Sequence, residues 1–297
     1  MTKFQQNTKT LDNYELLARG EYNINYLNKK TNQILRKNCG SQMHLDDQIG
    51  YEFHVLKLLE PTNRTPKVYS VDSNEGTLVM EYLPGHHLDY QTELSYVAPC
   101  LADIHSLQTN GEGLICPNNP LEAILEECKQ MIEIYQEPIK REKIDNMLQV
   151  ADLSIDTPYR CIINTELNST NFLIDGDYCR LVDWEKPLYA DPAQDLGHFL
   201  APTTTFWKTD VILTKSQMDD FIDRYIVAVN GRYDVSGLRE RTYKYVKMNC
   251  LRGVTWCAMA WIQYQEPGKE IKNESTWKKL GQYLDIEFLD MIEEFVR

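Results

Sequence analysis

Apolar and polar positions in the first part of the chain follow a pattern that predicts a small β-sheet. Residues 14–37 form two or three extended runs with a turn at Gly20. The segment 46–60, DDQIGYEFHVLKLLE, repeats its apolar residues at helical spacing. Two more extended runs within 67–83 flank the turn sequence DSNEG. We therefore expect residues 1–82 to form a strand-rich N-terminal lobe with one helix.

Helical periodicity dominates the rest of the chain, and only short β-like runs between residues 160 and 183 interrupt it. The predicted helices span residues 95–107, 120–135, 216–231, 238–265 and 276–296. The sequence LPGHH, with its Pro-Gly pair, separates the two regions and is typical of a hinge. The pattern predicts an α+β fold with a hinge at 83–90 and a larger, mostly helical C-terminal lobe at 91–297.

Local signals predict where some of these helices begin and end. Pro120 is expected at the start of its helix, because proline suits the first helical turn. Pro99 is expected either to bend its helix or to mark its first turn. Ser216 and Asp219 resemble a capping box at the start of a helix that Gly231 is expected to end.

Composition narrows the class of protein. The 297 residues are 42% hydrophobic and 25% charged, with neither a signal-peptide pattern nor a long apolar run, so we expect a cytoplasmic protein that does not enter a membrane. The eight cysteines are scattered without a C-x-x-C pair, which indicates reduced, mostly buried thiols rather than disulfides or a zinc site. The net charge of −13 disfavours nucleic acid as a partner. That charge could attract a cationic small molecule, or it could merely favour solubility.

The stretch NTELNSTNFLI, residues 164–174, is unusually polar for its apolar surroundings. It contains Glu166 and Asn171, and Asp183 follows in the apolar frame RLVDWE. A hairpin around DGD would bring Asn171 and Asp183 together at one cleft. An amide oxygen and a carboxylate suit Mg²⁺ held together with substrate phosphates. Glu166, one loop earlier, is in reach of an acceptor hydroxyl.

The N-terminal region offers weaker candidates for the other requirements of phosphoryl transfer. Gly20 and Asn23 lie between two predicted strands, where the backbone could cover phosphates. Arg36 or Lys37 on the next strand could supply a cation, and strand alternation alone does not choose between them. Glu52, in the predicted helix, could pair with that cation.

Taken together, these segments resemble the aminoglycoside phosphotransferase and choline kinase family, whose members have a protein-kinase-like fold. The family typically shows His-Gly-Asp-Leu-x-x-x-Asn, then Ile-Asp-Trp-Glu, then Asp-Pro-x-x-Asp-Leu. This chain has NTELNSTN, then LVDWE, then DPAQDL, with weaker matches at ARGEYN, ILRK, YEFHVLKLL and LVMEYLPG. The resemblance implies a bilobal kinase-like fold and an ATP- and Mg²⁺-dependent enzyme that phosphorylates a hydroxyl of a small molecule.

The resemblance also implies roles for particular residues. It assigns the nucleotide contacts to Gly20, Asn23, Arg36, Glu52, Glu81 and Leu83. It makes Asn171 and Asp183 the metal ligands, with Glu185 as a supporting or substrate contact. It further implies that Asp195 braces the catalytic loop and that His105 is structural.

The chain departs from the family motif at its start. Asn164, Thr165 and Glu166 stand where the family has histidine, glycine and aspartate. Glutamate keeps a carboxylate that can orient a hydroxyl, but it is one methylene longer. A displacement of about 1 Å can lower a rate roughly 100-fold. Three hypotheses remain: a working kinase with Glu166 as its catalytic base, a nucleotide-binding pseudokinase with a regulatory role, or other chemistry such as nucleotidyl transfer.

The acceptor is the least determined part of the prediction. Aromatic residues of the C-terminal region, Trp256 and Trp261 among them, could bind a cationic or amino-sugar-like acceptor through their ring faces, or could simply fill the core. We expect a small-molecule hydroxyl acceptor, choline-like or aminoglycoside-like, and a monomer or homodimer.

Overall fold

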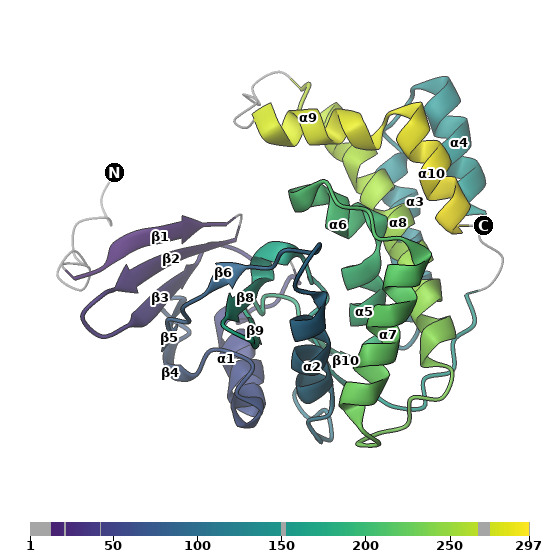
Figure 1. Cartoon of the computed structure of the whole chain (residues 1–297). Coiled ribbons are helices and arrows are strands. Elements are labelled where there is room, and N and C mark those ends of the chain that lie inside the picture. The colour runs from purple at the N-terminus through teal and green to yellow at the C-terminus, as the bar shows by residue number, and fades with distance from the viewer. Residues whose placement is uncertain (1–12, 21, 42, 150–152, 267–273, 297) are drawn as a thin grey trace.

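The computed structural model of the chain describes residues 13–20, 22–41, 43–149, 153–266 and 274–296 (Figure 1). The N-terminal part is a five-stranded antiparallel sheet with the strand order β1-β2-β3-β5-β4. Its strands are β1 (Glu15–Arg19), β2 (Asn23–Asn28), β3 (Gln33–Asn38), β4 (Val68–Asp72) and β5 (Thr77–Glu81). Helix α1 (Gln48–Leu59) packs against β4 and β5. The expected antiparallel sheet with one helix is confirmed, and residues 1–12 of the predicted lobe lie outside the described residues.

The β2–β3 hairpin and α1 bring a buried cation and a buried carboxylate together. In the hairpin, Arg36 pairs with Asn25, and strand alternation buries Arg36 while Lys37 is exposed. Helix α1 begins after Asp47, whose carboxylate accepts a hydrogen bond from the Gly50 amide at 2.9 Å. The helix therefore presents a buried face that includes Glu52.

The C-terminal part is mostly helical, and its longest helix, α8, packs against α3, α5, α6 and α10 (Figure 1). The helices are α2 (Leu94–His105), α3 (Pro120–Ile132), α4 (Pro138–Leu148), α5 (Pro192–Leu200), α6 (Pro202–Thr209), α7 (Lys215–Val229), α8 (Leu238–Gln263), α9 (Glu274–Tyr283) and α10 (Ile286–Val296). Two glycines permit close helix contacts. A Cβ at Gly197 would lie 2.3 Å from the Cβ of Tyr245, and one at Gly253 would lie 2.5 Å from the Cβ of Thr203. These positions let α5 and α6 lie directly against α8.

Short strands connect the sheet to the helices and carry the polar segments singled out in the sequence. Strands β6 (His86–His87), β8 (Phe172–Asp175) and β9 (Tyr178–Leu181) form one small sheet, and β7 (Cys161–Ile163) pairs with β10 (Leu188–Ala190). The β8–β9 hairpin turns at Gly176, whose φ is 58°. The structure thus contains the predicted hairpin around DGD, and residues 164–171 enter it from the end of β7.

Several helix boundaries differ from the sequence-based expectation. Helix α7 is capped by Thr214, whose side chain forms a capping box with Gln217, so the Ser216–Asp219 assignment is wrong. Pro99 lies inside α2, not in its first turn. The predicted helix at 276–296 is two helices, α9 and α10. Pro120 begins α3 as expected.

The cysteines are mostly buried, as expected. All eight cysteines are free, and those that are buried are Cys100, Cys128, Cys161, Cys179, Cys250 and Cys257. In the described part of the chain, none of the helices combines the length and the apolar character that a membrane crossing requires.

Candidate active site

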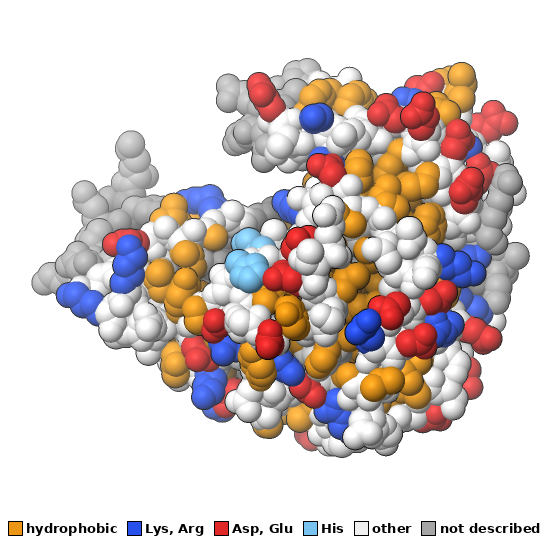
Figure 2. All heavy atoms as spheres, viewed as in Figure 1, with side chains coloured by type: hydrophobic (Ala, Val, Ile, Leu, Met, Phe, Trp, Pro, Cys, Tyr) orange, Lys and Arg blue, Asp and Glu red, His pale blue; other side chains and the backbone are white. Residues whose placement is uncertain are grey.

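A cleft of about 870 Å³ lies between the N-terminal sheet and the helical part. In Figure 2 the surface is deeply notched between the strand-rich side and α9. The cleft is lined by Arg19, Gly20, Asn23, Glu127, Glu166, Asn171, Asp183, Glu185, Lys186, His198, Trp207, Lys208, Arg252 and Trp256, among others. Many of the residues that the sequence singled out therefore face one shared space.

A buried carboxylate organises the loop that leaves β7. Asp195, on α5, accepts hydrogen bonds from the backbone amides of Asn164 at 2.8 Å and Thr165 at 2.7 Å. His105 Nε2 lies 3.2 Å from the same carboxylate, and its Nδ1 lies 2.7 Å from the hydroxyl of Tyr225. All of these groups are buried. The bracing of the loop by Asp195 and the buried, structural position of His105 agree with the resemblance.

Two residues with left-handed backbone conformations flank the site. Thr165 has φ 71° and Asp183 has φ 66°. A β-branched residue rarely adopts this conformation, and such strain persists only where the surroundings hold it. Asn164 Nδ2 donates to the backbone oxygen of Asp183 at 2.8 Å and links the two strained turns. The local backbone geometry therefore indicates a functional site.

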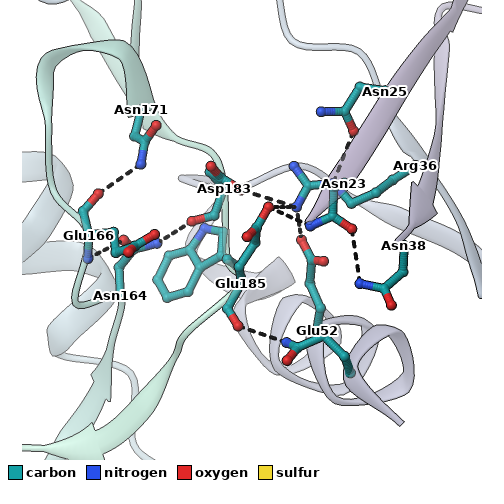
Figure 3. A network of polar contacts seen from close by, with 12 residues as sticks. Asn23, Asn25, Arg36, Asn38, Glu52, Asn164, Glu166, Asn171, Asp183 and Glu185 are labelled. Carbon is teal, nitrogen blue, oxygen red and sulfur yellow. Dashed lines mark hydrogen bonds and ion pairs between the residues drawn. The ribbon is translucent and has the colours of Figure 1, made fainter. Parts of the chain in front are cut away.

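Arg36 stands among carboxylates at the inner end of the cleft (Figure 3). Its Nη1 lies 2.6 Å from Glu52 Oε1 and 3.2 Å from Asp183 Oδ1. Its Nε donates to Asn25 Oδ1 at 3.0 Å. Burial opposes the charge of Arg36, but Glu52 and Asp183 outweigh it and raise the pKa of the guanidinium above its usual range. Arg36 is therefore a fixed, permanent cation, and the choice of Arg36 over Lys37 as the cation paired with Glu52 agrees with the geometry.

Glu185 joins the sheet to the helical part at the same place. Asn23 Nδ2 donates to its carboxylate, and Gln48 Nε2 donates to its backbone oxygen at 2.7 Å. Burial, reinforced by the charge of Asp183, raises the pKa of Glu185 to about 7. Three carboxylates, those of Glu52, Asp183 and Glu185, share the one guanidinium of Arg36, and a bound cation would neutralise their excess negative charge.

Asn171 and Asp183 lie on neighbouring backbone segments, and Asp183 Oδ1 already accepts a hydrogen bond from Arg36. Asn171 Nδ2 donates to the backbone oxygen of Glu166 at 2.7 Å, which leaves its Oδ1 available. The Val182 amide donates to the Asn171 oxygen at 2.8 Å and fixes the spacing of the two segments. No group of three or more His, Cys, Asp or Glu side chains in the described ranges could hold a metal alone. The pair instead fits Mg²⁺, which takes few protein ligands and completes its shell with phosphates and water.

Glu166 lies at the mouth of the site and has a partner that the sequence did not suggest. Its Oε1 is 2.7 Å from Lys186 Nζ. Its amide donates to Asn164 Oδ1 at 3.0 Å, so Asn164 fixes both sides of the loop. The carboxylate is one-third exposed and lines the cleft. An acceptor contact at Glu166 stays a prediction.

Of the other residues expected to contact the nucleotide, Gly20 lines the cleft, but Glu81 and Leu83 do not. Gly20 lines the cleft, and its amide donates to the Asn23 oxygen at 2.8 Å in a tight turn. Glu81 closes β5 and bonds with the backbone of Lys67, while Leu83 is buried just beyond. The cleft-lining residues do not include these last two, so adenine contacts at Glu81 and Leu83 stay a prediction.

The two tryptophans expected to bind the acceptor lie in different surroundings. Trp256 lines the cleft and meets Trp207 edge-to-face at 5.4 Å between ring centroids. Trp261 stacks on Trp277 at 4.0 Å and is not among the cleft-lining residues. A direct acceptor contact thus has geometric support at Trp256 and none at Trp261, which stacks one ring face on Trp277 and does not line the cleft.

Sequence reasoning missed three charged or polar features of the cleft. Lys186 follows the DWE motif directly, and only that adjacency could have marked it. His198 accepts a hydrogen bond from the Leu167 amide at 3.1 Å, and burial together with the charge of Arg252 lowers its pKa to about 4. Arg252 Nε lies 3.0 Å from Glu127 Oε2, an ion pair between α8 and α3 that no local motif announces.

A match to a family model identifies the family of this chain. The family model described as "Phosphotransferase enzyme family" matches residues 13–236, and the chain belongs to this family. The expected enzyme class, a phosphotransferase, is confirmed. Comparison with curated protein sequences finds no match.

Solved structures support the fold. A choline kinase from Streptococcus pneumoniae is 22% identical, with a TM-score of 0.62 over 94% of this chain and 93% of that chain. An ADP-bound aminoglycoside phosphotransferase is 16% identical, with a TM-score of 0.59 over 96% of each chain. A spectinomycin phosphotransferase in complex with ADP and spectinomycin is 11% identical, with a TM-score of 0.63 over 95% of this chain and 92% of that chain. The α+β kinase-like fold is therefore confirmed.

Proposed function

We propose that this protein is a small-molecule kinase that transfers the γ-phosphate of ATP to a hydroxyl, with Mg²⁺ as its cofactor. One observation carries the proposal: the buried Arg36–Glu52 pair lies against Asp183, and Asp183, Asn171 and Glu166 line one cleft. These are the parts that phosphoryl transfer requires, namely a phosphate-binding cation, oxygen ligands for a metal and a carboxylate for the acceptor.

The side chains divide the work by position. Arg36 is suited to hold phosphate oxygens, because Glu52 fixes its guanidinium at 2.6 Å. The oxygens of Asn171 and Asp183 would hold Mg²⁺, which when bound neutralises phosphate charge. Glu166 would orient the acceptor hydroxyl and accept its proton as the new O–P bond forms and the bond to ADP breaks.

A regulatory nucleotide-binding protein without transfer activity is the second candidate. The Glu166–Lys186 ion pair favours it, because an acceptor hydroxyl must compete with an ammonium for the carboxylate. The first proposal stands ahead of it, because the Glu166 side chain is partly exposed in the cleft.

The acceptor proposed from the sequence, a cationic or amino-sugar-like compound, can be made more specific. Trp207 and Trp256 offer aromatic surface, which suits one cationic group. Glu127 and Glu166 are each already paired with a cation of the protein. A compact, choline-like acceptor with one positive charge therefore suits the cleft better than an aminoglycoside with several amines.

The experiment is an ADP-release assay with MgATP and a panel of hydroxylated amines, amino sugars and neutral polyols. Turnover that depends on an acceptor, and that Asp183→Ala abolishes, supports a kinase. Asp175→Ala, an exposed aspartate on β8, is the matched control and should leave the rate unchanged. Equal rates in wild type and Asp183→Ala would overturn the metal assignment. Nucleotide-induced thermal stabilisation without turnover on any acceptor would support the regulatory candidate.

A further inference from the structure

The three residues that differ from the family's His-Gly-Asp all bond to one neighbouring segment. Asn164 Nδ2 donates to the Asp183 oxygen at 2.8 Å, and Thr165 Oγ1 donates to the Lys186 oxygen at 2.8 Å. Glu166 forms an ion pair with Lys186 Nζ at 2.7 Å. The departures are therefore not scattered changes, because each attaches the loop to residues 183–186.

Thr165 shows that this attachment is maintained against local strain. Its φ of 71° would suit glycine, and a β-branched residue is strained in that conformation. Glycine would remove the strain but has no hydroxyl to hold the Lys186 backbone. The observed hydrogen bond fixes the point from which the Lys186 side chain starts, so the ammonium reaches Glu166 from an anchored stem.

The Glu166–Lys186 pair is more sheltered than an ordinary surface pair. The side chains are 33% and 13% exposed, and within the described residues neither has another ion-pair partner. Sheltered pairs are less screened by salt than exposed ones. A glutamate is longer than the family's aspartate and has an additional rotatable bond. An ammonium at 2.7 Å restricts that freedom.

We propose that Lys186 is a positioning residue that holds the carboxylate of Glu166 in place and so compensates for its additional methylene. Its catalytic meaning rests on the proposed function. Asn164 and Thr165 belong to the same unit, because they fix the backbone from which the two charged side chains extend.

The kinetic test uses the acceptor found in the panel. Lys186→Met is expected to lower kcat roughly 10- to 100-fold, as a displaced catalytic group does, with the KM for ATP changed less than about threefold. Lys186→Arg should restore most of the rate, since it keeps a cation of similar reach. Lys57→Met, at an exposed, ion-paired lysine on α1, controls for general effects of losing a lysine. Glu166→Asp should lower kcat in wild type and have little further effect in Lys186→Met. An unchanged kcat in Lys186→Met, or rate losses that multiply in the double variant, would overturn the proposal.

A second measurement does not need turnover. Competitive acetylation followed by peptide mass spectrometry reports how accessible each lysine amine is. Lys186 should react several times more slowly than Lys208, an exposed lysine of the same cleft, and Glu166→Gln should accelerate only Lys186. A Lys186 that reacts as fast as Lys208 in wild type would overturn the pairing. Absence of any transfer in wild type would overturn the kinase function instead, so the two failures are distinguishable.

Discussion

Arg36 and Glu52 form a buried ion pair in which Nη1 lies 2.6 Å from Oε1, with side chains 5% and 2% exposed. Arg36 lies on β3 and Glu52 on α1, so the pair connects the N-terminal sheet to helix α1. The guanidinium also lies 3.2 Å from Asp183 Oδ1, and Asp183 lines the cleft. If the proposed function holds, we expect both the stability of the fold and nucleotide binding to depend on this contact.

Glu52→Leu should destabilise the protein by about 3–5 kcal/mol, because it leaves a buried guanidinium without its main partner. The double variant Arg36→Met/Glu52→Leu should recover most of that loss, yet bind MgATP at least about tenfold more weakly, since a charge-assisted contact of about 1.4 kcal/mol or more is gone. Urea unfolding and calorimetric titration measure the two effects. A double variant with wild-type nucleotide affinity would contradict the role of Arg36.

Asp183→Asn tests the metal site with little change of shape. Asparagine tolerates the left-handed backbone that Asp183 adopts at φ 66°, so the fold should be retained. Turnover should fall to background because a neutral amide replaces the carboxylate. Asn171→Ala should raise the Mg²⁺ concentration for half-maximal rate about tenfold, the effect of losing roughly 1.4 kcal/mol of ligand energy. Measuring the rate as a function of Mg²⁺ concentration tests this prediction. An unchanged half-maximal Mg²⁺ concentration in Asn171→Ala would count against Asn171 as a metal ligand.

His198 gives the folded protein a predictable sensitivity to acid. Its pKa is lowered to about 4, whereas the unfolded chain titrates at the ordinary value of 6.5. As the pH falls from 6.5 towards 4, the unfolded state binds the proton first, so stability is lost. From pH 7 to pH 5 this group should remove about 2 kcal/mol of unfolding free energy.

Urea unfolding of His198→Asn across the same pH range measures that loss. The variant should lack this component and so depend less on pH, while an amide oxygen can still accept from the Leu167 amide. The exposed His87→Asn should show the wild-type dependence. Parallel pH curves for wild type and His198→Asn would refute the assignment.

The Glu127–Arg252 pair should report the charge of the acceptor. Arg252→Met frees the carboxylate of Glu127 in the cleft. For a cationic acceptor this variant should lower KM, because the freed charge attracts it, while KM for ATP stays the same. For an anionic acceptor KM should rise. KM values for the acceptor panel, measured in wild type and in Arg252→Met, show whether the acceptor is cationic or anionic. An unchanged KM would place the acceptor away from the Glu127–Arg252 pair.

The sequence predicted the fold, because strand alternation and helical spacing depend on neighbouring residues, and it named some of the residues that line the cleft, Asn171 and Asp183 among them. It could not choose between Arg36 and Lys37 by alternation, since the buried face of β3 depends on where α1 packs. The family resemblance supplied that choice. Similarly, the pairs Thr214–Gln217 and Ser216–Asp219 both have the spacing of a capping box. In the structure the first pair forms it.

Contacts between distant segments were beyond the sequence. The chain shows that Glu166 is one methylene longer than aspartate, but the ammonium that meets it depends on how residues 164–166 and 183–186 are placed in space. Trp261 resembles Trp256 in sequence context, and only the stacking of Trp277 on its ring separates the two. The spacing of aromatic residues on one helix cannot show that a ring from another helix stacks on one of them.

The brace formed by Asp195 has a consequence for how the protein must be made. Asp195 lies on α5, and α5 is held in place by α8 through the contact of Gly197 with Tyr245. The segment matched by the family model ends at residue 236, before α8 begins at Leu238. A nascent chain that has emerged only to that point already contains Arg36, Glu166 and Asp183, yet it lacks the helix that seats the brace. The packing that holds Asp195 can therefore form only after α8 has been synthesised.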